Sequence, residues 1–354
     1  MGLRTQLQLK RSLHCGHLRT VAGRPCRHVK PTLALHWRYI GGTLWLHCGK
    51  NAQSRRGVTE MAWCSFHGGH SGRYCLHAHG TLADVLQVAY ARGFSHYGLS
   101  EHAPRYRTQD LFPEERHLTP EHLVHYFEQF VADARQLQVQ WQGRMEVLVG
   151  METERLPSDA WAEKMMGLRS ALQLDYLVGS VHDVDGVCID FSAEITDRLA
   201  SDLGGKAQLQ TRYFDAVADL VTTLRPEVVG HLDLIRKFDG PQPQIFPQAW
   251  PALQRALEAV EAAGSVLDVN AAPARRGMGP VYPLPEILNQ ARRMGIAVTL
   301  GDDSHAPQDV GSGLDACVNA LVSAGYREVH YLTRLDGAVA LARCPIDEMQ
   351  PCLR

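Results

Sequence analysis

The sequence of 354 residues predicts an α/β barrel, and two observations support that prediction. Short apolar runs typical of strands alternate with amphipathic stretches typical of helices seven or eight times. Side chains that bind metals also stand where the strand-like runs stop, as at Glu152, His182 and His231. Because the carboxyl ends of barrel strands form one rim that carries the chemistry, we expect these side chains to meet in a polynuclear metal site.

The regular pattern begins at Met61 and extends through the rest of the chain. We expect strands over 63–67, 96–100, 145–151, 175–181, 227–231, 265–270 and 297–301, with 328–332 as a candidate eighth. We expect helices over 81–92, 120–137, 158–171, 207–224, 247–263, 284–294 and 311–324. The strand-like runs lack polar alternation, as buried parallel strands do. An open sheet is less favoured, because no GxGxxG, P-loop or GxSxG motif follows a strand.

Charge is distributed unevenly along the chain, although the formal net charge is only −2. Residues 1–60 carry eleven Lys or Arg against one acid, Glu60, so residues 61–354 are clearly acidic. A groove that binds nucleic acid would need a net positive charge. We therefore expect no nucleic-acid partner for the barrel domain over 61–354. The length of this domain suits one barrel of about 250 residues with additions.

Nine cysteines occur without a CxxC pair or a framework spacing. An odd, scattered set in a chain of this length favours reduced thiols in the cytoplasm. No apolar run approaches the roughly 18 to 20 residues of a membrane helix, so we expect no membrane partner.

Residues 1–60 form a basic leader for which three interpretations stay open. An Arg-rich, acid-poor composition resembles an organelle transit peptide. A metal module could use Cys15, Cys26, Cys48 and the histidines near them, although their spacings match no zinc pattern. The third interpretation is that translation begins at Met61, in which case the leader is an artefact of start-site choice. In each case other than the metal module, we expect the leader to be disordered or absent.

The ligand types at the rim indicate the chemistry. Metals such as Zn, Fe and Mn accept imidazole nitrogen and carboxylate oxygen, and one carboxylate can bridge two ions. A site with many histidines and few carboxylates keeps a high positive charge, which suits a dianionic phosphate because metals neutralise charge on a transferring phosphoryl group.

Eight short motifs carry these ligand types along the chain. They are Phe66-His67-Gly68-Gly69-His70, Tyr74-Cys75-Leu76-His77, Ser100-Glu101-His102, Gly150-Met151-Glu152, Ser180-Val181-His182, Gly230-His231-Leu232-Asp233, Leu267-Asp268-Val269-Asn270 and Asp302-Asp303-Ser304-His305. At these motifs the chain resembles the polymerase and histidinol phosphatase superfamily, and within it the histidinol-phosphatase branch. The resemblance runs from about Cys64 to about Leu332 and covers the motifs in order.

The resemblance implies a distorted, seven-stranded (β/α)7 TIM-like barrel that holds three divalent transition-metal ions, Zn, Fe or Mn. It places His67, His70, Glu152 and Asp303 on one ion. Glu152 would bridge to a second ion held by His182 and His231. The third ion would be held by His77, His102 and His305. Glu152, Asp303 and His305 would be the catalytic residues.

The chain departs from the family pattern at one point. The family has His-x-His, whose i, i+2 spacing points both rings the same way from a strand, whereas two glycines separate His67 from His70. A bulge or turn could still bring the two rings together, because glycine is permissive for such backbone. His79 is an alternative to His77, and Glu154 is a weaker ligand candidate.

Further rim residues are assigned by their position. Arg275 follows Asn270 in a segment similar to the family's Asn-Thr-x-Gly-x-Arg, which implies a phosphate clamp, because a guanidinium grips two phosphate oxygens. Arg276 is the neighbouring alternative. Asp233 could orient a ligating imidazole. Glu101, Asp183 and Asp185 are candidates for binding a substrate amine.

The resemblance implies hydrolysis of L-histidinol phosphate, a small phosphate ester, to L-histidinol and phosphate in histidine biosynthesis. Two alternatives remain open. One keeps the family and changes the substrate to a nucleotide, nucleic acid or phosphotyrosine. The other is an inactive barrel that serves as a binding module, which the retained ligands disfavour. The sequence does not indicate an oligomeric state.

Overall fold

A computed structural model describes residues 37–40, 43–46, 63–156, 160–240 and 242–349. The leader predicted over 1–60 lies outside the described residues, apart from β1 (Trp37–Ile40) and β2 (Thr43–Leu46), which pair antiparallel. The interpretations of that segment therefore stay predictions. Within the described residues, no helix combines the length and the apolar character needed to cross a membrane.

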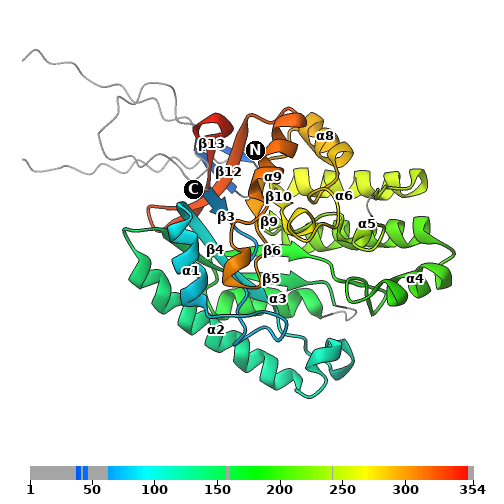
Figure 1. Cartoon of the computed structure of the whole chain (residues 1–354), viewed down its shortest axis with the longest axis horizontal. Coiled ribbons are helices and arrows are strands. Elements are labelled where there is room, and N and C mark those ends of the chain that lie inside the picture. The colour runs from blue at the N-terminus through cyan, green and yellow to red at the C-terminus, as the bar shows by residue number, and fades with distance from the viewer. Residues whose placement is uncertain (1–36, 41–42, 47–62, 157–159, 241, 350–354) are drawn as a thin grey trace, which may run out of the picture. The chain divides into compact units, whose positions relative to one another are not determined.

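Seven parallel strands form the central sheet, in the order β11-β10-β9-β6-β5-β4-β3. The strands are β3 (Trp63–Ser65), β4 (Phe94–His102), β5 (Glu146–Glu154), β6 (Tyr176–Ser180), β9 (Val228–Val229), β10 (Val266–Asn270) and β11 (Val298–Gly301). The edge strands β3 and β11 meet, because Phe66 N–H donates to the Leu300 carbonyl at 3.2 Å. The sheet is thus a nearly closed barrel, and the predicted fold class is confirmed (Figure 1).

Every residue of β6, β10 and β11 is buried, as expected for strands covered on both faces. One ring fills the barrel interior beside β4 and β5: a methyl group at Gly98 would overlap the hydroxyl of Tyr176, and one at Gly150 would lie within 2.6 Å of its ring. Glycine at these two positions is therefore what admits a tyrosine to the barrel axis.

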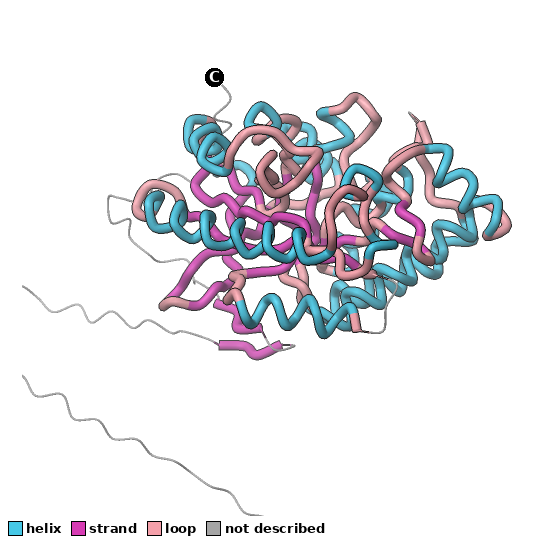
Figure 2. Tube along the Cα trace, turned by 90° about the horizontal axis from the view of Figure 1, so that it is seen from below, coloured by secondary structure: helices cyan, strands magenta, loops and turns pink. Residues whose placement is uncertain are grey.

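Helices pack around the outside of the strands (Figure 2). Seven of these helices are α1 (Leu82–Ala91), α2 (Pro120–Trp141), α3 (Trp161–Ala171), α5 (Lys206–Leu224), α6 (Trp250–Ala263), α8 (Pro285–Met294) and α9 (Leu314–Ser323). They match the seven predicted helices. In α6, Leu253, Leu257 and Val260 recur at helical spacing and are fully buried, and each such side chain stabilises the fold by about 1.5–3 kcal/mol.

Local sequence explains where several helices begin and end. Thr81 caps α1, because its hydroxyl accepts from Asp84 N–H while the Asp84 carboxylate accepts from Thr81 N–H. Gly264 ends α6 and Gly295 ends α8, both in the left-handed conformation that favours glycine.

The candidate eighth strand does not belong to the barrel. β12 (Glu328–Leu335) pairs antiparallel with β13 (Ala338–Pro345) in a separate two-stranded sheet. Asp336 and Gly337 both have positive φ in the connecting turn, the geometry of a tight hairpin. Only some residues of β12 are buried, unlike those of the inner barrel strands. The prediction of a strand over 328–332 is therefore confirmed, but its candidate place in the barrel is wrong.

Sequence reasoning also missed one ten-residue helix and several short elements. After β6 the chain makes a hairpin of β7 (Asp183–Val184) and β8 (Val187–Cys188), followed by α4 (Ala193–Asp202). A short helix, α7 (Ala272–Arg275), follows β10. Six 3-10 turns complete the elements: η1 (Thr108–Asp110), η2 (Pro113–Glu115), η3 (Leu234–Arg236), η4 (Pro247–Ala249), η5 (Pro307–Asp309) and η6 (Ile346–Glu348).

Candidate metal centre

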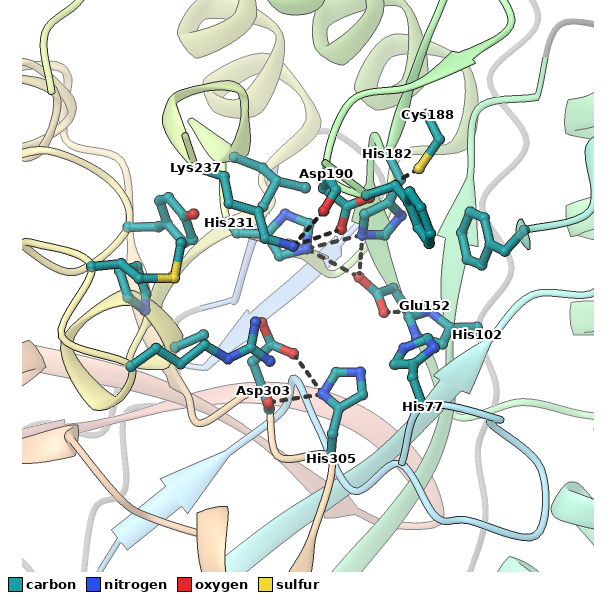
Figure 3. A pocket seen from close by; sticks show the side chains of 18 of the residues that line it. His77, His102, Glu152, His182, Cys188, Asp190, His231, Lys237, Asp303 and His305 are labelled. Atoms are coloured by element: carbon teal, nitrogen blue, oxygen red, sulfur yellow. Dashed lines mark hydrogen bonds and ion pairs between the residues drawn. The ribbon is translucent and has the colours of Figure 1, made fainter. Parts of the chain in front are cut away.

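The buried carboxylate of Glu152, near the end of β5, is the centre of the rim. Its Oε1 lies 3.0 Å from His67 Nε2, 3.4 Å from His182 Nε2 and 3.2 Å from His231 Nε2. Its Oε2 lies 3.0 Å from His102 Nδ1 and 3.7 Å from His70 Nε2. Five imidazoles from four strand ends therefore surround one carboxylate, and Figure 3 shows Glu152 beside His102, His182 and His231.

Several of these separations are close to those of atoms that share an ion. Two ligand atoms at about 2.0–2.2 Å from one zinc ion, in tetrahedral geometry, lie roughly 3.3–3.6 Å apart. His182 Nε2 and His231 Nε2 are also 3.2 Å apart. Buried nitrogens without hydrogen-bond partners, among them His70 Nε2 and His102 Nε2, also fit metal ligation.

Four groups of side chains could each hold a metal ion among the described residues. Together they include eight of the nine predicted ligands, all but His77. The groups are Glu152-His182-His231, His67-His70-Glu152, His67-His231-Asp303 and His70-Cys75-His102-His305. The rim therefore carries clusters of His, Glu and Asp that are able to bind metal ions.

The two glycines between His67 and His70 explain how a four-residue segment brings both rings to Glu152. Gly68 has φ +138° and Gly69 φ +77°, conformations that other residues rarely adopt. Space is also lacking: a methyl group at Gly68 would overlap Asp302, and one at Gly69 would lie 2.7 Å from Leu99. The departure from His-x-His is thus resolved by a tight turn after β3.

Asp303 lies in a second strained turn, after β11. Its φ of +47° is unusual for a residue other than glycine. Arg275 holds this turn, because its guanidinium donates to the Asp302 carbonyl and, at 2.9 Å, to the Asp303 carbonyl. The Arg275 side chain is almost buried and does not line the pocket described below, whereas Arg276 does. The phosphate-clamp role of Arg275 therefore stays a prediction, with a positioning role as its competitor.

Three carboxylates behind the histidines were not predicted as ligand partners. Asp268 Oδ2 lies 2.6 Å from His67 Nδ1, Glu154 Oε1 lies 2.6 Å from His182 Nδ1, and Glu101 Oε1 lies 2.8 Å from His70 Nδ1. A carboxylate on Nδ1 fixes the tautomer and leaves Nε2 for a metal. Asp233 Oδ2 accepts from Arg236 and from Leu284 N–H, so the hypothesis that Asp233 orients an imidazole stays a prediction.

The electrostatics of the cluster suit cations. Burial lowers the pKa of His67, but the negative charges of Glu152 and Asp268 outweigh it and raise that pKa well above its usual value. At the other side of the cluster, burial and then the neighbouring His70 lower the pKa of His102 to about 4. The carboxylates that attract a proton to His67 would equally attract a metal ion, which takes the proton's place on a neutral imidazole.

His77 lies at the border of the cluster. Its ring centroid is 4.9 Å from that of His305 and 5.3 Å from that of His102, but its Nδ1 is 3.1 Å from Glu114 Oε1. No ring contact joins the alternative residue, His79, to the other histidines. Of the two, His77 is therefore the one beside the site.

A pocket of about 350 Å³ opens above the cluster. Its floor contains Glu152 and the histidines around it, and its walls add two cations, Lys237 and Arg276. Two acids, Asp190 and Glu114, and two aromatic rings, Phe112 and Phe191, also line it. This volume suits a small molecule. The β7–β8 hairpin contributes to the wall, because Cys188 of β8 lines the pocket together with Asp190.

Comparison with known proteins supports the geometry. The model of the PHP domain family matches residues 68–272. A probable histidinol-phosphatase from Schizosaccharomyces pombe is 38% identical over 70% of this chain and 85% of its own length. A probable histidinol-phosphatase from Deinococcus radiodurans is 32% identical over 73% of this chain and 94% of its own length.

A solved structure shares the fold. Histidinol phosphate phosphatase from Lactococcus lactis, crystallised with zinc, L-histidinol and phosphate, superposes with a TM-score of 0.59 at 19% identity, over 79% of this chain and 99% of that one. Since the family model covers more than half of the sequence and the rim carries the ligand clusters in the predicted order, the chain belongs to the PHP domain family.

Proposed function

We propose that this chain is a metal-dependent phosphomonoesterase that hydrolyses L-histidinol phosphate to L-histidinol and phosphate, a step of histidine biosynthesis. The observation that carries the proposal is the carboxylate of Glu152 enclosed by five imidazoles at the floor of a pocket sized for a small molecule. The names of the relatives in fission yeast and Deinococcus support the substrate.

Three divalent transition-metal ions, Zn, Fe or Mn, are the proposed cofactors. Glu152, His182 and His231 would hold one, and His67, His70 and Asp303 would join Glu152 around another. His102 and His305 would hold the third, with His77 as the ligand that the family resemblance implies. When bound, the ions would supply Lewis-acid charge at the phosphoryl group and a nucleophile from water.

The protein's own cations complete the phosphate end of the pocket. Lys237 Nζ is anchored at 2.7 Å by the Asp190 carbonyl, so its charge is held at the pocket wall. Arg276 lines the same pocket from the end of α7. A phosphate above Glu152 would meet both positive charges, which strengthen as water is excluded.

The remaining wall suits the organic part of the substrate. Phe112 and Phe191 offer faces on which an imidazole ring can stack. Asp190 and Glu114 are the acids in the pocket, and we propose that one of them binds the substrate amine. The three acids suggested by the sequence have other neighbours: Glu101 contacts His70, Asp183 lines a neighbouring cavity, and Asp185 lies 3.5 Å from Arg212.

The test is phosphate release from histidinol phosphate, a nucleoside monophosphate and an aryl phosphate by protein whose metal content is measured. We expect histidinol phosphate to exceed the others in kcat/KM by at least about a hundredfold, on the order of 3 kcal/mol. Asp190→Asn should reduce this preference, while turnover of the aryl phosphate, which has no amine, should change less. Equal turnover of all three esters would favour a broad phosphatase, and no turnover by metal-loaded protein would favour a binding module.

The scattered cysteines bear on where the protein works. Cys64, Cys75, Cys188, Cys317 and Cys344 are free thiols in the described part of the chain. We propose a cytoplasmic location, which suits both reduced thiols and a biosynthetic reaction.

A further inference from the structure

We infer that Arg105 sets the size limit on the organic group of the phosphate ester, by holding Phe112 as a partition between the pocket and a second cavity. The inference rests on the proposed phosphomonoesterase function and deepens it, because it assigns a positioning residue for the organic end of the substrate. Arg105 lines the second cavity but not the pocket, and it belongs to none of the four ligand groups.

The second cavity has a volume of about 200 Å³ and lies beside the pocket, because the two spaces share four lining side chains. These side chains are Phe112, His182, Cys188 and Phe191. They form the boundary between the two spaces, and Phe112 and Phe191 are its two bulky apolar members. The far side of the second cavity is also partly apolar, with Leu111, Leu156 and Ile195. If Phe112 moved aside, the pocket would extend into a space that accepts an aromatic ring.

Arg105 holds Phe112 by its ring and by its backbone. The guanidinium carbon of Arg105 lies 4.1 Å from the centroid of the Phe112 ring, so the planar cation packs on the ring face. The same guanidinium is fixed by Glu115, because Nε donates to Oε2 at 2.7 Å and Nη2 donates to Oε1. Glu115 Oε2 also accepts from Phe112 N–H at 2.9 Å. One ion pair therefore fixes both parts of Phe112.

The setting of this ion pair indicates a positioning role. Arg105 is 4% exposed and Glu115 is 5% exposed. A buried ion pair is seldom more stabilising than apolar residues of the same volume, because the cost of removing both charges from water offsets their attraction. Its best attested use is to specify one conformation. The segment between β4 and α2 needs such a device, since its only helical elements are the three-residue turns η1 and η2.

Calorimetry with two phosphonates of different size tests the inference on metal-loaded, full-length protein. Phenylphosphonate and 2-naphthylphosphonate share the charged group and differ by one fused ring. We expect wild-type protein to bind the phenyl compound more tightly. Arg105→Lys keeps a positive charge beside Glu115 but loses the planar face and the two-pronged contact. The ratio of the naphthyl Kd to the phenyl Kd should fall about tenfold in this variant, the effect of one lost packing contact in a pocket, with metal content unchanged.

A matched variant controls for general loosening of the segment. Arg107 also makes a two-pronged contact, with Asp110 at 2.7 Å and 2.6 Å, but it borders neither cavity. Arg107→Lys should therefore keep the wild-type ratio. Tighter binding of the larger probe in Arg105→Lys is a gain that partial unfolding cannot produce. An equal fall of the ratio in both variants, or in neither, would overturn the inference.

A double-variant cycle tests whether Arg105 acts through Phe112. Phe112→Leu should lower the ratio as much as Arg105→Lys does, and the two changes together should lower it no further, because both act on one ring. Additive effects, or an unchanged ratio in Phe112→Leu, would show that Arg105 does not work through this partition. Glu115→Gln offers a milder change if Arg105→Lys does not fold, and it should lower the ratio by a smaller factor.

The outcome is separable from that of the proposed function. Neither phosphonate is hydrolysed or contains an amine, so the size limit can be present in a protein that does not prefer histidinol phosphate. Conversely, a strong preference for histidinol phosphate with the same phosphonate ratio in wild type, Arg105→Lys and Phe112→Leu would remove this inference alone. Failure of metal-loaded wild-type protein to bind either phosphonate would also overturn it.

Discussion

Arg275 and Arg276 are adjacent in the sequence but have different surroundings. Substituting each by alanine distinguishes a residue that positions a metal ligand from one that contacts the substrate. The Arg275 guanidinium donates to the carbonyls of Asp302 and Asp303, and its Nε lies 3.5 Å from Asp309. Arg276 lines the pocket instead. We expect Arg275 to act through the position of Asp303, and Arg276 to act on the substrate directly.

The size of each effect follows from these contacts. Asp303 is held at φ +47°, a conformation that costs on the order of 1–3 kcal/mol and persists only when its surroundings enforce it. Removing Arg275 should therefore weaken metal binding about 10–100-fold, as for other residues that orient a ligand. Removing Arg276 deletes a charged hydrogen bond to phosphate and should lower kcat/KM by about 1.5–3 kcal/mol with metal affinity unchanged.

Metal titration against a chromophoric chelator, followed by phosphate release at limiting and at saturating zinc, measures both quantities. Arg275→Ala should regain most of its activity at saturating zinc, and Arg276→Ala should not. Arg275→Lys should recover only part of the metal affinity, because an ammonium group cannot reproduce the two-pronged contact. If Arg275→Ala kept full metal affinity and lost kcat/KM, Arg275 would be the phosphate clamp implied by the family resemblance, and the positioning argument would be refuted.

The remaining predictions concern the bridging carboxylate and the barrel interior. Glu152→Gln should lose bound metal and activity together, because a neutral amide is a poor bridging ligand; elemental analysis would contradict this if the variant purified with full metal content. Gly98→Ala should destabilise the fold by about 1–3 kcal/mol, since its methyl group would overlap Tyr176. The same change at exposed Gly167, in the middle of α3 with no atom within 4 Å, should stabilise it by up to about 1 kcal/mol. Urea unfolding compares the two, and equal effects would mean that the overlap with Tyr176 is relieved at no cost.

The barrel could be predicted because its strands are short, apolar and buried on both faces, so each is recognisable without knowing its neighbours. The predicted metal ligands follow from the positions of these strands. A residue such as His182 or His231, two residues beyond the end of a strand in a parallel barrel, is expected to lie on the rim. This reasoning failed for the β12–β13 hairpin, because a strand-like run in the sequence does not show whether its partner strand is parallel or antiparallel.

The partners of the ligands could not be predicted, because they depend on contacts between distant segments. Asp268 and His67 are 201 residues apart, and Glu154 and His182 are 28 apart. An acid within a strand carries no signal that its side chain meets an imidazole of another strand.

The turn between His67 and His70 shows how the chain obtains a family geometry with an unusual spacing. Two residues with positive φ turn the backbone sharply, so that His67 and His70 reach opposite oxygens of Glu152. A third glycine contributes from the segment after β9, because a methyl group at Gly230 would lie 2.9 Å from the His67 ring. The position of the His67 ring therefore depends on the glycines around it as well as on the carboxylates that contact it. These glycines come from segments that are far apart in the sequence.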